Sequence, residues 1–268
     1  MIRLIKPYIS FSEVEAEFRD VFESGMFTKG IYTREFPEEL KKYTGAKYAF
    51  LTTSATTALS ACLRILNIGE GDEVIVSDFS FPASVNVVED TGAKAVFADV
   101  SLDTFNMLPE ELEKKISART RAVIYVDALG NPSGVAKIKA ICQKHNIPLI
   151  EDAACSIGSS VEGVKVGNIA DLTCFSFHPR KLLTTGEGGA ILTNNDQYSE
   201  KLLVKLNHGA IAAENGLDFV DYGYNYRLPD LQSIMGIVQL KKLDRIVEVR
   251  NQIRDRYVEH LREFGLTP

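Results

Sequence analysis

The chain alternates short apolar runs with stretches of helical periodicity. The apolar runs are rich in β-branched residues and show little polar–apolar alternation. Such runs are typical of strands covered on both faces, as in parallel sheets. The predicted strands cover 73–78, 94–100, 121–127, 148–152, 172–177 and 189–193, and the predicted helices cover 56–66, 82–90, 109–116, 135–145 and 198–207.

The order of these elements predicts the fold class. Strand–helix alternation indicates an α/β fold, with a mostly parallel sheet between two helical layers. The chain changes character at Pro229, because from there to about residue 264 it is helical and rich in charge. We therefore expect a large domain over 1–228. Over 229–268 we expect a helical segment that leads to a small C-terminal domain, which is largely absent from this chain.

Composition narrows the class of protein. The chain has 268 residues, of which 45% are hydrophobic, and a net charge of −6, which argues against nucleic acid or an anionic membrane as a partner. The four cysteines form no CxxC pair or ligand cluster, so we expect free thiols and no metal site. The first ten residues lack the apolar core of a signal peptide, and no run approaches about 18 apolar residues. These features predict a cytoplasmic protein.

Candidate chemistry gathers where strands end. Ligands of parallel α/β sheets bind beyond the carboxyl ends of the strands. Asp152 closes one predicted strand, Ser176 lies near the end of the next, and Lys181 follows shortly after. Residues 52–59 (TTSATTAL) place five hydroxyls at a helix start, where free N–H groups and the helix dipole favour a phosphate. Taken alone, that cluster is more typical of an ordinary hydroxyl-capped helix.

Together these groups match the needs of pyridoxal phosphate (PLP). Its aldehyde forms an imine with a lysine, and its pyridine nitrogen needs a carboxylate to hold the proton. Its ring face stacks on an aromatic side chain. Phe79 and Phe81, which follow the first predicted strand, are both candidates for that aromatic.

The motifs and their order resemble the DegT/DnrJ/EryC1/StrS aminotransferases, which share the PLP fold type I of aspartate aminotransferase. The resemblance runs from about Pro7 to the end of the chain. Its most specific parts are EDAACSIGS from residue 151, FSFHPRK from residue 175 and GEGG from residue 186. YNYRLPDLQ from residue 224 follows in the family's order.

The resemblance implies a role for each matching residue. Lys181 matches the Schiff-base lysine, which also moves the proton during the reaction. Asp152 matches the carboxylate that pairs with the pyridinium nitrogen. Without the surrounding motif, Lys181 would be interpreted as a solvated surface lysine, and Asp152 as a helix N-cap. The other expected cofactor contacts are the backbone of Ala55 and Thr56 and the hydroxyl of Ser176 at the phosphate, and Phe81 and Ala154 on the two ring faces.

Four further residues are interpreted, of which Asn225 and Cys155 take their interpretation from the family. Asn225 matches a phosphate contact that comes from the neighbouring subunit, which implies a homodimer with shared active sites. Cys155 stands where relatives have Gln or His at the cofactor's 3-oxygen, and a thiol is the weaker hydrogen-bond partner. Glu187 is interpreted as a turn or dimer-interface residue. We interpret His178 as a histidine packed at a strand end rather than as a catalytic group.

The resemblance implies amino transfer from an amino acid, glutamate by family habit, to a nucleotide-linked keto sugar. A 3- or 4-keto-6-deoxy sugar is the most common acceptor, as in polysaccharide biosynthesis. Lys181 argues against sugar dehydration, because the relatives that catalyse it carry histidine there. Two alternatives stay open from the sequence. One is a PLP enzyme that acts on a cyclitol or forms an aromatic amine, and the other is a truncated, non-catalytic PLP-fold protein that acts as a binding or assembly partner.

Overall fold

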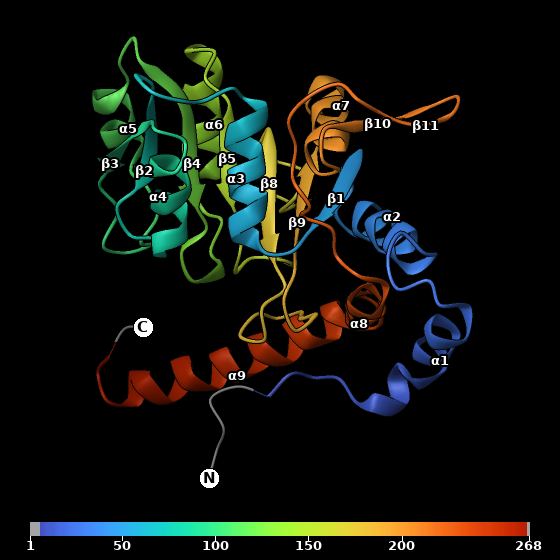
Figure 1. Ribbon diagram of the computed structural model, residues 1–268. Helices are drawn as coiled ribbons and strands as arrows, with labels where there is room; N and C mark the ends of the chain where they lie inside the picture. Colours follow the sequence, from blue (N-terminus) through green and yellow to red (C-terminus); the bar gives the residue numbers. More distant parts are fainter. Residues whose placement is uncertain (1–5, 267–268) are drawn as a thin grey trace.

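The computed structural model describes residues 6–266, which are built around a seven-stranded sheet (Figure 1). The strand order is β1-β9-β8-β5-β4-β2-β3, and within the described residues only β9 runs against its neighbours in this sheet. The mostly parallel sheet predicted from the sequence is therefore confirmed. Its strands are β1 (Tyr48–Thr52), β2 (Glu73–Ser77), β3 (Lys94–Ala98), β4 (Thr120–Val126), β5 (Leu149–Asp152), β8 (Leu172–Ser176) and β9 (Gly189–Thr193).

Helices cover both faces of the sheet. They are α1 (Glu15–Ser24), α2 (Tyr32–Thr44), α3 (Ala55–Ile65), α4 (Pro82–Glu89), α5 (Pro109–Lys115), α6 (Val135–Lys144), α7 (Asp196–Lys205), α8 (Asp230–Leu240) and α9 (Leu243–Glu263), with short 3-10 turns at η1 (Phe11–Glu13) and η2 (Ala128–Gly130). Successive strand residues point to opposite faces. On one face Val74 and Ile150 pack against α3, α4 and α7, and on the other Ile75 and Leu149 pack against α5 and α6, whereas Phe175 packs against α2 and α8.

Each strand and helix predicted before Pro229 is present, with its ends shifted by about two residues at most. The elements that we did not predict are α1, α2, β1, the two short 3-10 turns and the strands of two small hairpins. The strand β1 lies at one edge of the sheet, and four of its five residues are only partly buried. Its hydrophobic pattern is correspondingly weak, because an edge strand is held by pairing on one side only.

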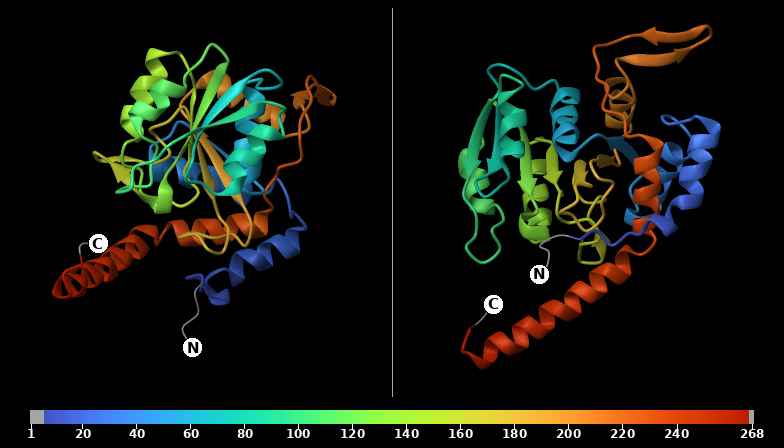
Figure 2. Two further views of the ribbon diagram at one scale, coloured as in Figure 1. Left: turned by 90° about the vertical axis from the view of Figure 1, so that its left-hand side faces the viewer. Right: turned by 60° about the horizontal axis from the view of Figure 1, so that its bottom comes forward.

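The segment from Pro229 is helical, and a turn at Lys241–Lys242 that we did not predict divides it into α8 and α9. The helix α8 is buried against α2, where Gly236 faces the ring of Phe36 so closely that a Cβ would lie 2.3 Å from it. Leu243 is fully buried just after the turn. From there α9 extends away from the sheet, with Ile253 and Tyr257 exposed (Figure 2).

Two small antiparallel hairpins complete the fold. One pairs β6 (Ser160–Val161) with β7 (Val164–Lys165), and the other pairs β10 (Ala210–Ala213) with β11 (Gly216–Phe219). The β10–β11 hairpin projects from the body and exposes Leu217 and Phe219 (Figures 1 and 2). Of the helices in residues 6–266, none is both long and apolar enough to cross a membrane.

Candidate active site

A cavity of about 510 Å³ opens at the carboxyl edge of the sheet. That volume lies within the range of small-molecule sites. The loops that follow β5 and β8 form part of its wall and extend toward α8 and α9 (Figure 1). The structure brings to this cavity every predicted cofactor residue except Asn225. They are Ala55, Thr56, Phe81, Asp152, Ala154, Cys155, Ser176 and Lys181.

One end of the cavity is suited to an anion. Ala55 and Thr56 lie in the first turn of α3, where backbone N–H groups have no intrahelical acceptor and the helix dipole is positive. Ser54 caps this helix by accepting a hydrogen bond from the backbone N–H of Thr57 at 3.1 Å. The start of β9 lies so close that a Cβ on Gly189 would be 2.5 Å from the carbonyl carbon of Ser54. Glycine there lets the start of β9 approach the start of α3 this closely.

Asp152 ends β5 beneath the cavity and is only 6% exposed. Its Oδ2 accepts a hydrogen bond from the Ser84 hydroxyl at 2.6 Å, and its Oδ1 accepts one from the backbone N–H of Ala154 at 3.2 Å. Burial raises the pKa of Asp152 above its ordinary value, and these two hydrogen bonds and the charge of Lys181 offset part of that rise. We did not predict Ser84, since a serine at the start of an amphipathic helix carries no distinguishing signal.

Lys181 supplies the amine. It lies half-buried in the loop after β8, where its Nζ donates to Sγ of Cys155 at 3.0 Å. Cys155 itself is exposed toward the cavity. The amine and the thiol therefore share one side of the space above Asp152.

Of the two candidate aromatics, Phe81 lines the cavity. It is 72% exposed and immediately precedes α4, so its ring is free to cover a flat ligand. Phe79 packs instead on Phe105, with ring centroids 5.0 Å apart. Ala154 also lines the cavity, and its small side chain leaves room for a planar ring.

His178 and Glu187 also line the cavity. The His178 side chain is 34% exposed and its Nε2 lies 3.9 Å from Oε1 of Glu187, so it is not the packed histidine favoured by the sequence. The backbone carbonyl of Glu187 accepts hydrogen bonds from Thr185 and Gln232, which fits its predicted place in a turn.

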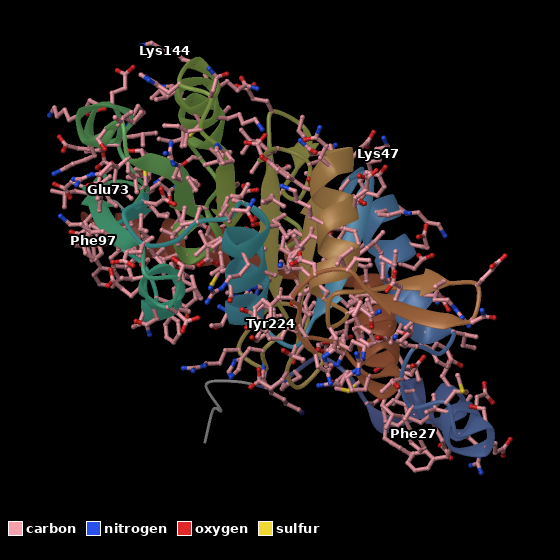
Figure 3. The ribbon with its side chains drawn as sticks, turned by 45° about the horizontal axis from the view of Figure 1, so that its top comes forward. Phe27, Lys47, Glu73, Phe97, Lys144 and Tyr224 are labelled. Carbon is pink, nitrogen blue, oxygen red and sulfur yellow. The ribbon has the colours of Figure 1, made fainter. Side chains whose placement is uncertain are left out.

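Asn225 lies apart from the cavity and is exposed. It forms an isolated antiparallel bridge with Asn207. Its neighbour Tyr224, which is labelled in Figure 3, stacks on Tyr226 with ring centroids 4.7 Å apart. Tyr226 packs in turn against the core beside α3. This segment is thus anchored to the body while Asn225 faces solvent.

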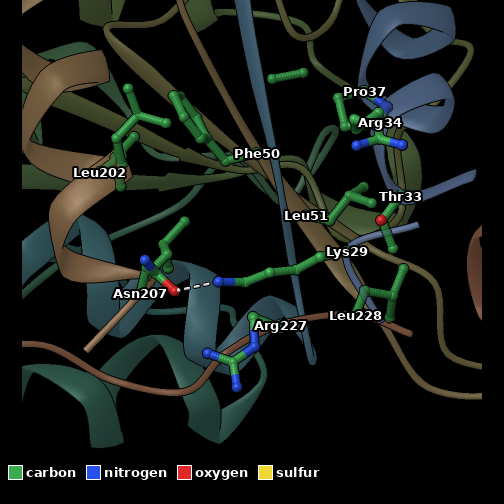
Figure 4. A pocket seen from close by; sticks show the side chains of 13 residues that line it. Lys29, Thr33, Arg34, Pro37, Phe50, Leu51, Leu202, Asn207, Arg227 and Leu228 are labelled. Atoms are coloured by element: carbon green, nitrogen blue, oxygen red, sulfur yellow. Dashed lines mark hydrogen bonds between the residues drawn. The ribbon is translucent and has the colours of Figure 1, made fainter. Parts of the chain in front are cut away.

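A second cavity of about 430 Å³ lies between α2, β1 and α7 (Figure 4). Its floor is apolar, and its charged groups are the cations Lys29, Arg34 and Arg227. Lys29 donates to Oδ1 of Asn207 at 2.9 Å. No carboxylate of the described chain lines this cavity, so it lacks the amine–carboxylate pair of the first one.

The first cavity fits PLP by the chemistry of its donors. A helix start suits the phosphate, a buried carboxylate suits the pyridine nitrogen, a lysine amine suits the aldehyde, and an exposed ring suits the cofactor's face. Within residues 6–266, no group of three His, Cys, Asp or Glu side chains is arranged to hold a metal ion.

Comparison with known proteins agrees with this geometry. The model of the DegT/DnrJ/EryC1/StrS aminotransferase family matches residues 10–267. A transaminase of UDP-4-amino-4,6-dideoxy-N-acetyl-beta-L-altrosamine from Campylobacter jejuni is 37% identical, over 96% of this chain and 69% of its own length. GDP-perosamine synthase from Vibrio cholerae is 34% identical, over 97% of this chain and 71% of its own length.

A solved structure is similar over the same extent. Spr1654 from Streptococcus pneumoniae, described as a sugar aminotransferase and solved in its PLP form, superposes with a TM-score of 0.90 at 31% identity. The match covers 97% of this chain and 71% of that protein. The chain therefore belongs to the DegT/DnrJ/EryC1/StrS aminotransferase family and is a PLP-dependent aminotransferase.

Proposed function

We propose that the protein transfers an amino group from an amino acid, most simply glutamate, to a keto sugar linked to a nucleotide. The observation that carries this proposal is the convergence of Lys181, Asp152 and the start of α3 on one cavity of about 510 Å³. The names of the relatives support the acceptor class, because they include a GDP-sugar synthase and a UDP-sugar transaminase. A 3- or 4-keto-6-deoxy sugar is the acceptor that we favour.

In this proposal each residue of the cavity wall has a task. The backbone N–H groups of Ala55 and Thr56 and the hydroxyl of Ser176 bind the phosphate. Phe81 and Ala154 hold the ring between them, and Cys155 lies beside its 3-oxygen. When bound, PLP supplies an electron-accepting ring that stabilises the electron pair of a broken C–H bond.

Asp152 and Lys181 carry out the steps that need protein groups. The Asp152 carboxylate holds a proton on the pyridine nitrogen, which strengthens the ring as an electron acceptor. Lys181 Nζ first holds the cofactor and, once the amino donor displaces it, moves the proton between the substrate carbon and the cofactor.

We further propose that the active protein is a homodimer in which Asn225 contacts the phosphate bound by the partner subunit. Asn225 is exposed and does not line the cavity of its own chain. The neighbouring β10–β11 hairpin exposes Leu217 and Phe219, which suits a covered rather than a solvated position. We also propose that residues 1–228 form the large, PLP-binding domain and that α8 and α9 form a helical segment after it.

The absorption spectrum of the protein with PLP tests the reaction. We expect a visible band that is absent in Lys181→Ala and that disappears when glutamate is added. Adding a nucleotide-linked keto sugar should then restore the band as nitrogen passes to the acceptor. A folded wild-type protein that gives no band would contradict the assignment of Lys181.

Mixed dimers test the shared site. Lys181→Ala and Asn225→Ala chains should each be nearly inactive alone. If each site combines Lys181 of one chain with Asn225 of the other, a mixed dimer contains one site with both native residues and regains activity. Two inactive variants that never complement each other would argue against the shared site.

A further inference from the structure

Three buried carboxyl groups lie close together near the ends of β4 and β5. Asp127, Glu151 and Asp152 are 1%, 0% and 6% exposed. A buried carboxylate is destabilised unless hydrogen-bond donors satisfy its oxygens. The donors around each group therefore decide which of the three holds the negative charge. One hydroxyl donates to each carboxyl: Ser156 to Asp127, Thr173 to Glu151 and Ser84 to Asp152.

The second oxygen of each group separates Asp152 from the other two. Oδ1 of Asp127 and Oε1 of Glu151 are buried and have no hydrogen-bond partner among the described residues. Asp152 has a donor on both oxygens, since the backbone N–H of Ala154 satisfies Oδ1. Lys181 adds a favourable charge for Asp152, and Lys139 adds one for Glu151. The donors on both oxygens therefore favour ionisation at Asp152 over its two neighbours.

Ser84 is held firmly in place for this contact. It is fully buried in the first turn of α4, and its backbone N–H donates to the carbonyl of Phe81 at 3.1 Å. The 2.6 Å distance from its hydroxyl to Oδ2 of Asp152 is typical of a charge-assisted hydrogen bond. Ser84 does not line the cavity, so it acts on a bound ligand only through Asp152.

We propose that Ser84 is a positioning residue for amino transfer, because its hydroxyl keeps the Asp152 carboxylate ionised and fixes its orientation toward the cavity. The proposal rests on the proposed function, in which Asp152 holds a proton on the cofactor. It also gives α4 a double task. The residue before this helix, Phe81, covers the ring, and the third residue of the helix sets the carboxylate below it.

Three single variants test the proposal. Ser84→Ala removes the hydroxyl, Ser84→Thr keeps one, and Thr173→Val is the matched control that removes the hydroxyl from Glu151 instead. PLP affinity is measured by absorbance titration. The titration of Asp152 is followed by infrared difference spectroscopy of the cofactor-free protein, with Asp152→Asn used to identify its band. We expect Ser84→Ala to weaken PLP binding ~10-fold or more, the usual effect of losing a hydrogen bond to a charged group, and to move the Asp152 titration to higher pH.

Ser84→Thr should restore both properties, and Thr173→Val should leave both unchanged. In an Asp152→Asn background, Ser84→Ala should change PLP affinity less than about 2-fold, because the coupling between contacting residues is then lost. If the Ser84→Ala chain does not fold, Ser84→Cys retains the volume with a weaker donor and should show the same two changes at smaller size.

The proposal is overturned if Ser84→Ala alters neither property, if Thr173→Val alters both equally, or if the full effect persists in Asp152→Asn. Failure of the proposed function is distinguishable from these outcomes. A wild-type protein that does not bind PLP would overturn that function, whereas the infrared titration of Asp152 in the cofactor-free protein still decides the role of Ser84.

Discussion

Glu151 and Asp152 are consecutive residues of β5 whose side chains point to opposite faces of the sheet. Both are buried, yet only Asp152 has a donor on each oxygen. Burial raises the pKa of Glu151 to about 7, and the hydrogen bond from Thr173 only partly offsets this. Neighbouring carboxyls in one strand therefore acquire different chemistry from their local donors. The donors around Asp152 favour its charged form, whereas Glu151, on the opposite face, is about half protonated near pH 7.

The largest expected effect is a difference in activity between variants of Asp152 and variants of Glu151. Asp152→Asn should lower kcat/KM for amino transfer by ~10²–10³-fold, the range typical of removing one preorganised electrostatic partner from a reacting centre. Glu151→Gln should change it less than about 3-fold at pH 8. Steady-state kinetics of both variants measure the difference. Equal losses would mean that the two faces do not differ in the way proposed.

The pH dependence of stability tests whether Glu151 is protonated in the folded protein near neutral pH. A carboxyl whose folded pKa is raised stabilises the fold most below its unfolded value, and that stability is lost as the pH rises through the folded pKa. The pKa of Glu151 is about 7 against an ordinary 4.5. The free energy of unfolding should therefore fall by about 3 kcal/mol as the pH rises from 4.5 to 8.

Glu151→Gln removes this titration. Urea unfolding across that pH window should therefore show a smaller decline for the variant than for the wild type. Parallel stability curves for the two proteins would contradict a raised pKa of Glu151 in the folded state.

A backbone contact on the cavity side should give the next effect. Gly189→Ala places a methyl group 2.5 Å from the carbonyl carbon of Ser54, where backbone atoms leave no room. We expect a loss of ~1–3 kcal/mol in the free energy of unfolding, as for other overpacked sites. PLP binding should also weaken, because the start of α3 is displaced. Gly163→Ala is a useful control, since a Cβ there meets no atom within 4 Å and only its φ of +82° adds strain.

The smallest effect concerns the thiol beside the amine. Cys155→Gln replaces a weak hydrogen-bond partner by a stronger one, and should tighten PLP binding by ~5-fold, which corresponds to about 1 kcal/mol for an added hydrogen bond. Cys155→Ala removes the contact with Lys181 Nζ at 3.0 Å and should not tighten PLP binding. Absorbance titration of the two variants distinguishes a hydrogen-bonding role from simple space at this position.

Much of the fold was predictable from hydrophobic pattern. The buried strands β2, β4, β5, β8 and β9 are apolar runs, because both of their faces are covered. The edge strand β1 carries a weaker pattern, and the amphipathic helix α2 contains Pro37, a residue that usually interrupts a helix. Neither element was predicted. The break between α8 and α9 was missed as well, because it depends on where Leu243 finds a buried position and not on a helix-breaking residue.

The candidate site, like the fold, was only partly predictable from the sequence. Sequence motifs identified Lys181, Asp152 and the start of α3. Chemistry alone left Phe79 and Phe81 as candidates, and the family resemblance pointed to Phe81. Packing shows why the two rings differ, since Phe79 contacts Phe105. The exposure of His178 toward the cavity was likewise decided by the path of the loop after β8.

By itself the sequence determined the parallel sheet, the family and the residue types at the strand ends, because these follow from local patterns along the chain. Only the tertiary structure decided that Ser84, far from Asp152 in sequence, donates to that carboxylate. Among the described residues, Asp127 and Glu151 each keep one oxygen without a hydrogen-bond partner. Charge in a protein interior depends on the donors within a few ångströms. Those donors come from separate elements that only folding brings together.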